Sequence, residues 1–573
     1  MNINGRHSRK RRSDKPLVGI VCLCKKHFSI FGFLLLLVQT LPAFSAASVT
    51  PKRGGTLHFA TEADPNSLDP ATIVSGEEGT LVCCVFNGLY DLDSDGKVQP
   101  MLAEALPEIS ADALTYTIHL RPGVAFSNGR ELTAEDVIYS LERFFDPATA
   151  TPEMSYFRGV RGGDAFVNAR LKEAASTNKL AANAQRWIEP KRVAGLRALN
   201  QRTVQIQLDQ PNLALTQILA AVFSGIVPRE AVALWGDRVG THPMGTGPFI
   251  LKEWVRGVRL RFERNPHYFR PGEPYLDAIE VLVNVDWTTQ AMMIERGELD
   301  VEFLITDPDF LRFGKTQTSQ LILESVKGTI PTYATLNCEL PPFTNRLVRM
   351  AINHAVNKDA LARKMRNRAV PARGQLPMND RGFNPDLPEY AYDPIRARKL
   401  LAEAGYPTGF EITLWAANSG VWKNIAQIVQ HDLKAVGVVA HIKEVTWPTL
   451  TDNMQRRNNI AIGLTDWGAA INDPKDTLDS LLNGDAITDQ ACLNWAFYSN
   501  KTVQELFRTA AVETDPDRRI QQYQKIEQLI VQDAPWLFLC HRNTDTIRQQ
   551  WLKGFRPRGF WPILRLETTW IDK

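Results

Sequence analysis

The sequence predicts an α/β protein with a parallel sheet near its C-terminal third. Three observations lead to this fold class. The chain has 573 residues, which is too long for one hydrophobic core and predicts two or three domains. Strand-like and helix-like patterns are mixed along its whole length. Residues 410–445 read as a strand, a helix and a second strand, which is typical of the crossover unit of a parallel sheet.

The first 46 residues predict a cleaved secretory signal. Residues 1–47 carry a charge of +7, so the net charge of +3 leaves 3 − 7 = −4 for the remainder. An apolar run at 30–38 follows the basic residues, and small residues then suggest cleavage near Ala46. The run is too short to span a bilayer. The alternative is that the segment is not cleaved and anchors the protein in the membrane. The small-residue end contains no cysteine, so the sequence shows no lipid-attachment site there.

The charge distribution argues against nucleic-acid binding. The stretch "SRKRR" belongs to the predicted signal, and the rest of the chain is mildly acidic. No basic stripe with interleaved aromatic residues follows it. We therefore expect no nucleic-acid partner.

Five cysteines remain after the predicted cleavage site. Their number is odd and their spacing matches no zinc site. Two adjacent cysteines lie in the apolar stretch "TLVCCVFNGLY" and are expected to be buried thiols. One disulfide among the other three is possible in an oxidising compartment. The five are Cys83, Cys84, Cys338, Cys492 and Cys540.

Local patterns predict individual elements along the chain. Residues 115–120 and 202–210 alternate apolar and polar side chains, which predicts two strands. A helix is expected over 133–145, with Thr133 as its cap and acidic residues in its first turn. A shorter helix is expected to begin after Asp393 and to end at Gly405. Residues 170–190 are polar and are expected to form a helical or loop excursion.

The sequence offers no constellation for catalysis. It lacks a nucleophile elbow, a zinc-protease motif, a phosphate-binding loop and a dinucleotide fingerprint. Its histidines are scattered, and His354 lies on an apolar helix pattern that is typical of a core residue. We expect neither a metal nor a cofactor, and a secreted hydrolase is the alternative from another functional class.

Five stretches occur in an order that resembles a known family. They are "GGTLHFATEADPNSLDPA" (54–71), "LRPGVAFSNGRELTAEDVIYSLER" (120–143), "MGTGPFILKEW" (244–254) with "ERNPHYF" (263–269), "RMAINHAVNKDAL" (349–361) and "YDPIRARKLLAEAGYP" (392–407). Together they resemble the family 5 bacterial solute-binding proteins, the dipeptide- and oligopeptide-binding receptors of ABC importers. The resemblance covers essentially the whole chain after the signal.

The resemblance implies a two-lobed periplasmic-binding-protein fold of the cluster C type, with an extra small domain inserted in lobe I. Carried onto this chain, it predicts the following boundaries: lobe I at 47–90, 198–325 and 536–573, the inserted domain at 91–197, and lobe II at 326–535. In this arrangement "GTGPF" (245–249) is a structural corner of lobe I, where glycines allow segments to pack closely. The crossover unit at 410–445 falls in lobe II.

The resemblance also implies a function. The protein would be a monomeric periplasmic receptor that captures a peptide or peptide-like solute between its lobes. It would deliver this ligand to an ABC transporter permease in the inner membrane. Receptors for oligosaccharides and for nickel or metallophore chelates are the alternatives within the same family.

One segment departs from the peptide receptors of the family. Their lobe II motif has Trp, then Asp three residues later, then an acidic residue before Pro, and the first Asp binds the α-ammonium of the peptide. In "LTDWGAAINDPKDTL" (464–478), alignment on Trp467 places Ala470 at that Asp. Burying an ammonium without a carboxylate partner costs several kcal/mol. A free-amine peptide would therefore need another carboxylate.

The candidate ligand-binding residues follow from this comparison. Three carboxylates are candidates for the ammonium, tryptophans near the expected cleft can stack on a ligand, and one arginine is a candidate for a ligand carboxylate. A capping or surface role is the alternative for the acids, lobe packing for the tryptophans, and a solvated loop for the arginine. The residues are Glu62, Asp64, Asp466, Trp415, Trp422, Trp467 and Arg373.

Overall fold

The computed structural model describes residues 50–573 except 74, 177–191, 304, 316–319, 367, 419, 488, 490–491, 561 and 563. The chain divides into two parts, residues 1–50 and 51–573. The predicted signal segment and most of the excursion expected at 170–190 lie outside the described residues. Everything below concerns the second part.

A four-stranded sheet joins segments that are distant in the sequence. Its order is β1-β10-β9-β8. β1 is parallel to β10, and the other pairs are antiparallel. The strands are β1 (Thr56–Ala60), β8 (Phe249–Val255), β9 (Arg259–Arg264) and β10 (Ala278–Leu282).

A second four-stranded sheet has the order β4-β5-β7-β6 and is antiparallel throughout. It confirms the two strands expected from alternation, since Tyr116, Ile118, Val204 and Ile206 are all buried. The sheet continues past the boundary predicted at 197, because β7 pairs with β5. The strands are β4 (Glu108–Ile109), β5 (Thr115–His119), β6 (Leu196–Asn200) and β7 (Thr203–Gln207).

The third sheet has seven strands, with the path β11-β17-β12-β16-β14-β15 and β13 paired to β17. β14 is parallel to both β15 and β16. The predicted crossover unit is confirmed, because β14, α12 (Gly420–Lys434) and β15 follow one another. The strands are β11 (Val301–Phe303), β12 (Leu321–Leu336), β13 (Ala369–Pro371), β14 (Phe410–Ala417), β15 (Val438–Val445), β16 (Ile462–Asp466) and β17 (Trp536–Gln549).

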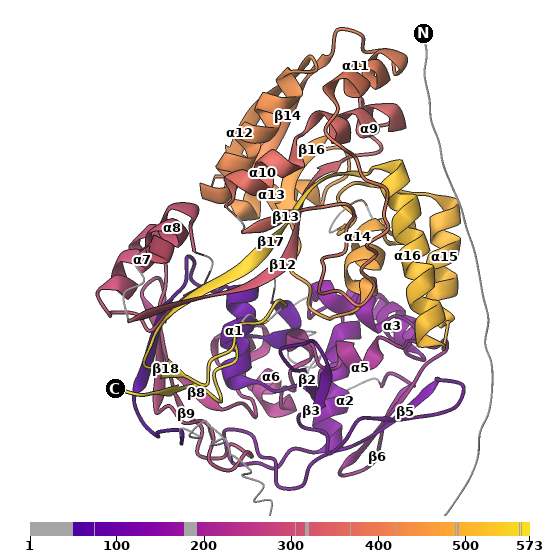
Figure 1. Cartoon of the computed structure of the whole chain (residues 1–573). Helices are drawn as coiled ribbons and strands as arrows, with labels where there is room; N and C mark the ends of the chain where they lie inside the picture. The colour runs from indigo at the N-terminus through magenta and orange to yellow at the C-terminus, as the bar shows by residue number, and fades with distance from the viewer. Residues whose placement is uncertain are drawn as a thin grey trace, which may run out of the picture. The chain divides into compact units, whose positions relative to one another are not determined.

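Two strands of this sheet, β12 and β17, are unusually long. Figure 1 shows them side by side, and their antiparallel register runs from the pair Leu321 and Gln549 to the pair Thr335 and Trp536. The register shifts between 326 and 330 and again between 332 and 333. The boundary between lobe II and lobe I predicted at 536 coincides with the start of β17, which pairs with β12 along its length. The lobe boundaries themselves stay predictions.

The helices expected from capping signals are present. Thr133 caps α2 in a capping box with Asp136, and the Asp393 side chain accepts a hydrogen bond from the Arg396 N–H at the start of α11. The helices are α1 (Gly76–Val85), α2 (Ala134–Glu142), α3 (Gly163–Ser176), α5 (Leu215–Ile218), α6 (Arg229–Trp235), α7 (Trp287–Glu295), α8 (Asp307–Lys315), α9 (Arg346–Ala355), α10 (Lys358–Lys364), α11 (Pro394–Glu403), α13 (Trp447–Met454), α14 (Ser480–Leu482), α15 (Lys501–Val512) and α16 (Pro516–Asp533). Short strand pairs are β2 (Tyr90–Leu92) with β3 (Val98–Pro100), and β18 (Leu552–Lys553) with β19 (Trp570–Ile571).

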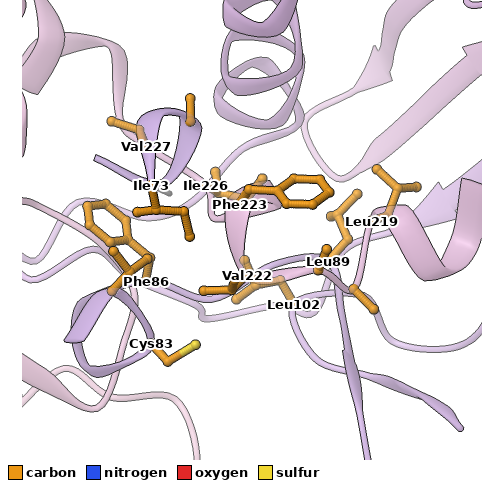
Figure 2. Close-up of a cluster of buried hydrophobic side chains, with 14 of the residues drawn as sticks. Ile73, Cys83, Phe86, Leu89, Leu102, Leu219, Val222, Phe223, Ile226 and Val227 are labelled. Carbon is orange, nitrogen blue, oxygen red and sulfur yellow. The ribbon is translucent and has the colours of Figure 1, made fainter. Parts of the chain in front are cut away.

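The glycine corner explains part of the packing beside α1. Figure 2 shows part of the apolar cluster beside this helix, in which Phe86 and Leu89, from the segment after α1, lie among residues from elsewhere in the chain such as Phe223. The Gly247 N–H donates to the Val85 carbonyl at 2.7 Å, at the end of α1. A Cβ atom on Gly245 or Gly247 would overlap that carbonyl group. The corner is therefore built of glycine because two backbones meet there.

The variant Gly247→Ala is expected to lose about 1–3 kcal/mol of unfolding free energy, because the added methyl group overpacks against backbone that cannot move aside. Denaturant unfolding of the purified protein measures the loss. Gly314→Ala is the control, since a Cβ atom there meets nothing within 4 Å. Equal stability of the two variants would contradict this account of the corner.

All five cysteines of the described part are free thiols. Cys83, Cys84, Cys492 and Cys540 are buried, and Cys338 is partly buried. Burial raises the pKa of the thiols of Cys83 and Cys338 to about 11 and that of Cys540 to about 12. Within the described residues, no helix is both long and apolar enough to cross a membrane.

Candidate functional site

The carboxyl ends of three parallel strands define one edge of the seven-stranded sheet. β14 ends at Ala417, β15 at Val445 and β16 at Asp466, and the parallel pairing places these ends on the same side. In open α/β sheets, ligands bind outside the carboxyl ends of the strands. Trp422 and Trp447 lie in the helices that follow β14 and β15.

An ion pair lies at this edge. Asp466 is the last residue of β16, and its Oδ2 atom accepts a hydrogen bond from Nη2 of Arg542 on β17. Nε of Arg542 donates to Oγ1 of Thr332 at 2.9 Å. Burial raises the pKa of the Asp466 carboxyl above its usual range, although the Arg542 guanidinium opposes this shift. The Asp466 carboxylate is therefore paired with the Arg542 guanidinium.

An aromatic ring also contacts the guanidinium of Arg542. The guanidinium carbon of Arg542 lies 5.4 Å from the ring centre of Trp422, within the range of a cation–π contact. The Trp422 ring in turn stacks on Trp447, with 5.6 Å between centres and 27° between planes. We call these four residues, Asp466, Arg542, Trp422 and Trp447, the Arg542 group. Two of them were expected from the sequence to bind ligand.

The segment after β16 folds around a buried carboxylate, that of Asp476. Oδ2 of Asp476 accepts from Trp467 Nε1 at 2.6 Å, and Oδ1 accepts from the Ala470 N–H at 3.3 Å and from Tyr156 O–H at 2.7 Å. Burial raises the pKa of Asp476 to about 6 against the effect of these hydrogen bonds. Asn472 Nδ2 also donates to the Asp95 carbonyl at 3.4 Å. The loop thereby contacts two segments of the predicted inserted domain.

Ala470 is buried within this loop, with 7% of its surface exposed. The neighbouring carboxylates are already occupied. Asp473 forms a two-bond ion pair with Arg519, with both N···O distances at 2.8 Å. Asp476 has the three donors described above. Neither Asp473 nor Asp476 is therefore free to bind a ligand ammonium in place of the carboxylate that is absent at Ala470.

The structure shows the contacts of Glu62 and Asp64. The Glu62 N–H donates to Glu77 Oε1 at 3.3 Å, and the Glu62 side chain is exposed. The Asp64 carboxylate accepts from Trp254 Nε1 at 2.9 Å and from the Gly257 N–H at 2.8 Å. Asp64 thus stabilises the β8–β9 hairpin through hydrogen bonds to β8 and to the turn, which is a structural role. Ligand contact by either residue stays a prediction.

Arg373 and Trp415 make their contacts with residues outside the Arg542 group. Arg373 is exposed, and its Nη1 donates to the Pro385 carbonyl at 3.2 Å. It lines a pocket of about 210 Å³ together with Lys358 and Tyr390. The Trp415 ring carries the Lys443 ammonium 3.6 Å from its centre. Their roles in binding also stay predictions.

A larger pocket does not involve the predicted residues. It has a volume of about 460 Å³ and lies between α10 and α12, where Met365, Ile425 and His431 are among its lining residues. No group of three or more histidine, cysteine or acidic side chains within the described ranges could hold a metal ion. The polar and aromatic side chains at the carboxyl edge therefore remain the candidate site.

Arg542 was not among the residues expected from the sequence. It lies in β17, 76 positions from Asp466, and only the pairing of β12 with both β16 and β17 brings the two together. Tyr156 was missed for the same reason, since 320 positions separate it from Asp476. The sequence carries no local signal for either contact.

Comparison with known proteins decides the family. The model of the bacterial extracellular solute-binding proteins, family 5, which describes the middle region of these proteins, matches residues 97–489. This match spans more than half of the chain. The protein belongs to family 5 of the bacterial extracellular solute-binding proteins. Members are binding receptors, so this protein is a solute receptor and not an enzyme.

Individual relatives agree with the family assignment. The receptor is 29% identical over 519 residues to the glutathione-binding protein GsiB of Escherichia coli O1:K1, covering 90% of this chain and 92% of that protein. The solved structure of DppA from Helicobacter pylori with the peptide STSA has a TM-score of 0.78 at 24% identity, covering 91% and 99%. AgaA with agropinic acid, from A. tumefaciens R10, has a TM-score of 0.76 at 24% identity, also covering 91% and 99%. These structures establish the two-lobed fold.

Proposed function

We propose that this receptor is exported to the periplasm, acts as a monomer, and captures a peptide or peptide-like compound for an ABC transporter permease. The observation that carries the proposal is the gathering of charged and aromatic side chains at the carboxyl edge of β14, β15 and β16. The names of its relatives support the ligand class, since they include proteins that bind glutathione, a peptide and agropinic acid.

Capture requires that a ligand stabilise the closed arrangement of the lobes. A ligand that touches both lobes shifts the population toward the closed state by its differential affinity for that state. Two contacts connect the loop after β16 to the predicted inserted domain, from Tyr156 to Asp476 and from Asn472 to Asp95. A ligand at the neighbouring edge would add to these contacts in the closed state.

Native mass spectrometry of the receptor purified from the periplasm of its own organism tests the proposal. Peptides or peptide-like compounds released on denaturation would support it. Release of a sugar or a metal chelate would contradict the proposed class of peptide-like ligands. Conversion of the ligand on prolonged incubation would contradict the assignment as a receptor.

A further inference from the structure

The Asp466–Arg542 ion pair leaves one atom of each partner unused. The pair itself employs Oδ2 of Asp466 and Nη2 of Arg542. Within the part of the chain that the structure describes, Arg542 Nη1 has no hydrogen-bond partner and Asp466 Oδ1 has no side-chain partner. The two side chains are 15% and 22% exposed, so a ligand can reach them. The pair therefore offers a donor beside an acceptor.

We infer that this pair recognises the α-amino-acid group of a ligand, meaning an ammonium and a carboxylate on the same carbon. The inference rests on the function proposed above and names its ligand class. Asp466 Oδ1 would accept from the ligand ammonium, and Arg542 Nη1 would donate to the ligand carboxylate. Four alternating charges then lie together with no net charge, so each buried charge has a partner of opposite sign.

The arginine is held ready for this contact before a ligand arrives. Asp466 and Thr332 hold two of its nitrogens by hydrogen bonds, and the Trp422 ring contacts the guanidinium. A guanidinium in a fixed orientation loses little side-chain entropy when it binds a carboxylate. Trp447 stacks on Trp422 in turn, so the Arg542 group forms a preformed surface.

An ordinary α-linked peptide does not satisfy this pair. Its N-terminal carbon carries an ammonium but only a neutral amide, so Arg542 Nη1 would lose water without gaining a charged partner. Hydrogen bonds to charged groups are stronger than neutral ones, and an unmade one leaves a desolvation cost. Ala470 removes the carboxylate that would hold such a peptide elsewhere, and Asp473 and Asp476 are occupied. The site thus favours γ-linked or free amino-acid heads.

Isomeric peptides provide the test. γ-Glutamyl-cysteinyl-glycine and α-glutamyl-cysteinyl-glycine have the same composition and charge, but only the γ-isomer keeps the α-ammonium and α-carboxylate on one carbon. Isothermal titration of the exported receptor, stripped of bound ligand, is expected to show at least about ten-fold tighter binding of the γ-isomer. Arg542→Gln and Asp466→Asn should each reduce this preference to within about three-fold.

Arg548→Gln is the matched control. Arg548 lies on the same strand, pairs with Glu324 at 2.9 Å, and belongs to a pair with similar exposure, 13% and 29%. This variant is expected to keep the isomer preference. A circular dichroism melt of each variant shows that the fold is intact, and the two independent variants of the pair keep the test informative if one fails to fold.

Three outcomes overturn the inference. Equal affinity for the two isomers, or an unchanged preference in both variants of the pair, would do so while the peptide-receptor function stands. Absence of binding of either isomer up to about 1 mM, repeated with γ- and α-glutamyl-alanine, would also reject the amino-acid head. The ligand class of the receptor would then be decided separately by the compounds that copurify with it.

Discussion

Replacing Asp473 by asparagine is expected to destabilise the receptor by about 3–5 kcal/mol, because it leaves the Arg519 guanidinium buried without its counter-ion. Both residues are almost fully buried, at 3% and 5% exposure. Burial alone would raise the pKa of Asp473, but the Arg519 guanidinium more than offsets it, and the pKa lies below its usual range. The carboxylate is therefore charged and paired at neutral pH.

Denaturant unfolding at neutral pH measures this loss. Asp485→Asn is the control, because Asp485 pairs with Arg508 at 2.8 Å on the surface, where an ion pair contributes only about 0–1 kcal/mol. Similar small losses in both variants would show that Arg519 finds another partner. Since the folded pKa of Asp473 is lowered, its stabilising effect is present above the unfolded pKa and is lost as the pH falls through the folded value.

The neighbouring acid Asp380 is expected to behave in the opposite way. It is buried, and burial followed by repulsion from Asp473 and Asp476 raises its pKa to about 8 against a hydrogen bond from the Gly382 N–H. A raised folded pKa means that stability is complete below the unfolded value of about 4 and is lost as the pH rises through about 8. The wild type should therefore lose stability over this window.

Asp380→Asn removes this loss while keeping an acceptor oxygen for Gly382. The variant is expected to be close to the wild type at about pH 4 and more stable by about 2–4 kcal/mol above about pH 8. Unfolding free energies measured across this range test the expectation. Asp386→Asn, at an exposed position of the same loop, should show no such pH-dependent difference. A constant difference for Asp380→Asn at all pH values would contradict the account.

Local features of the fold could be predicted from the sequence. The cap at Asp393, the capping box at Thr133 and the crossover unit at 410–445 each depend on residues close together in the chain. Their physical causes are hydrogen bonds within one helical turn and apolar periodicity. Both depend only on residues that are close together in the sequence. The family resemblance supplied the rest of the architecture through motifs rather than through periodicity.

The candidate site could be predicted only in part. Asp466 and Trp422 were expected to bind ligand, and both belong to the Arg542 group. Their partner Arg542 could not be predicted, because the register of β12 against β16 and β17 sets that contact. The reverse holds for Asp64, whose sequence position suggested the cleft but whose carboxylate is engaged by Trp254 and Gly257. Side-chain partners across a sheet depend on tertiary pairing, which short motifs do not encode.

The buried thiols make this receptor suited to optical labelling. Thiol reagents attack the thiolate, and the raised pKa values of Cys83, Cys338 and Cys540 keep these groups protonated and unreactive in the folded protein. A cysteine introduced at an exposed position in each lobe would therefore react with a fluorescent dye ahead of the native thiols. Energy transfer between two such dyes would convert ligand capture into a colour change, so the receptor could serve as a sensor without prior removal of its own cysteines.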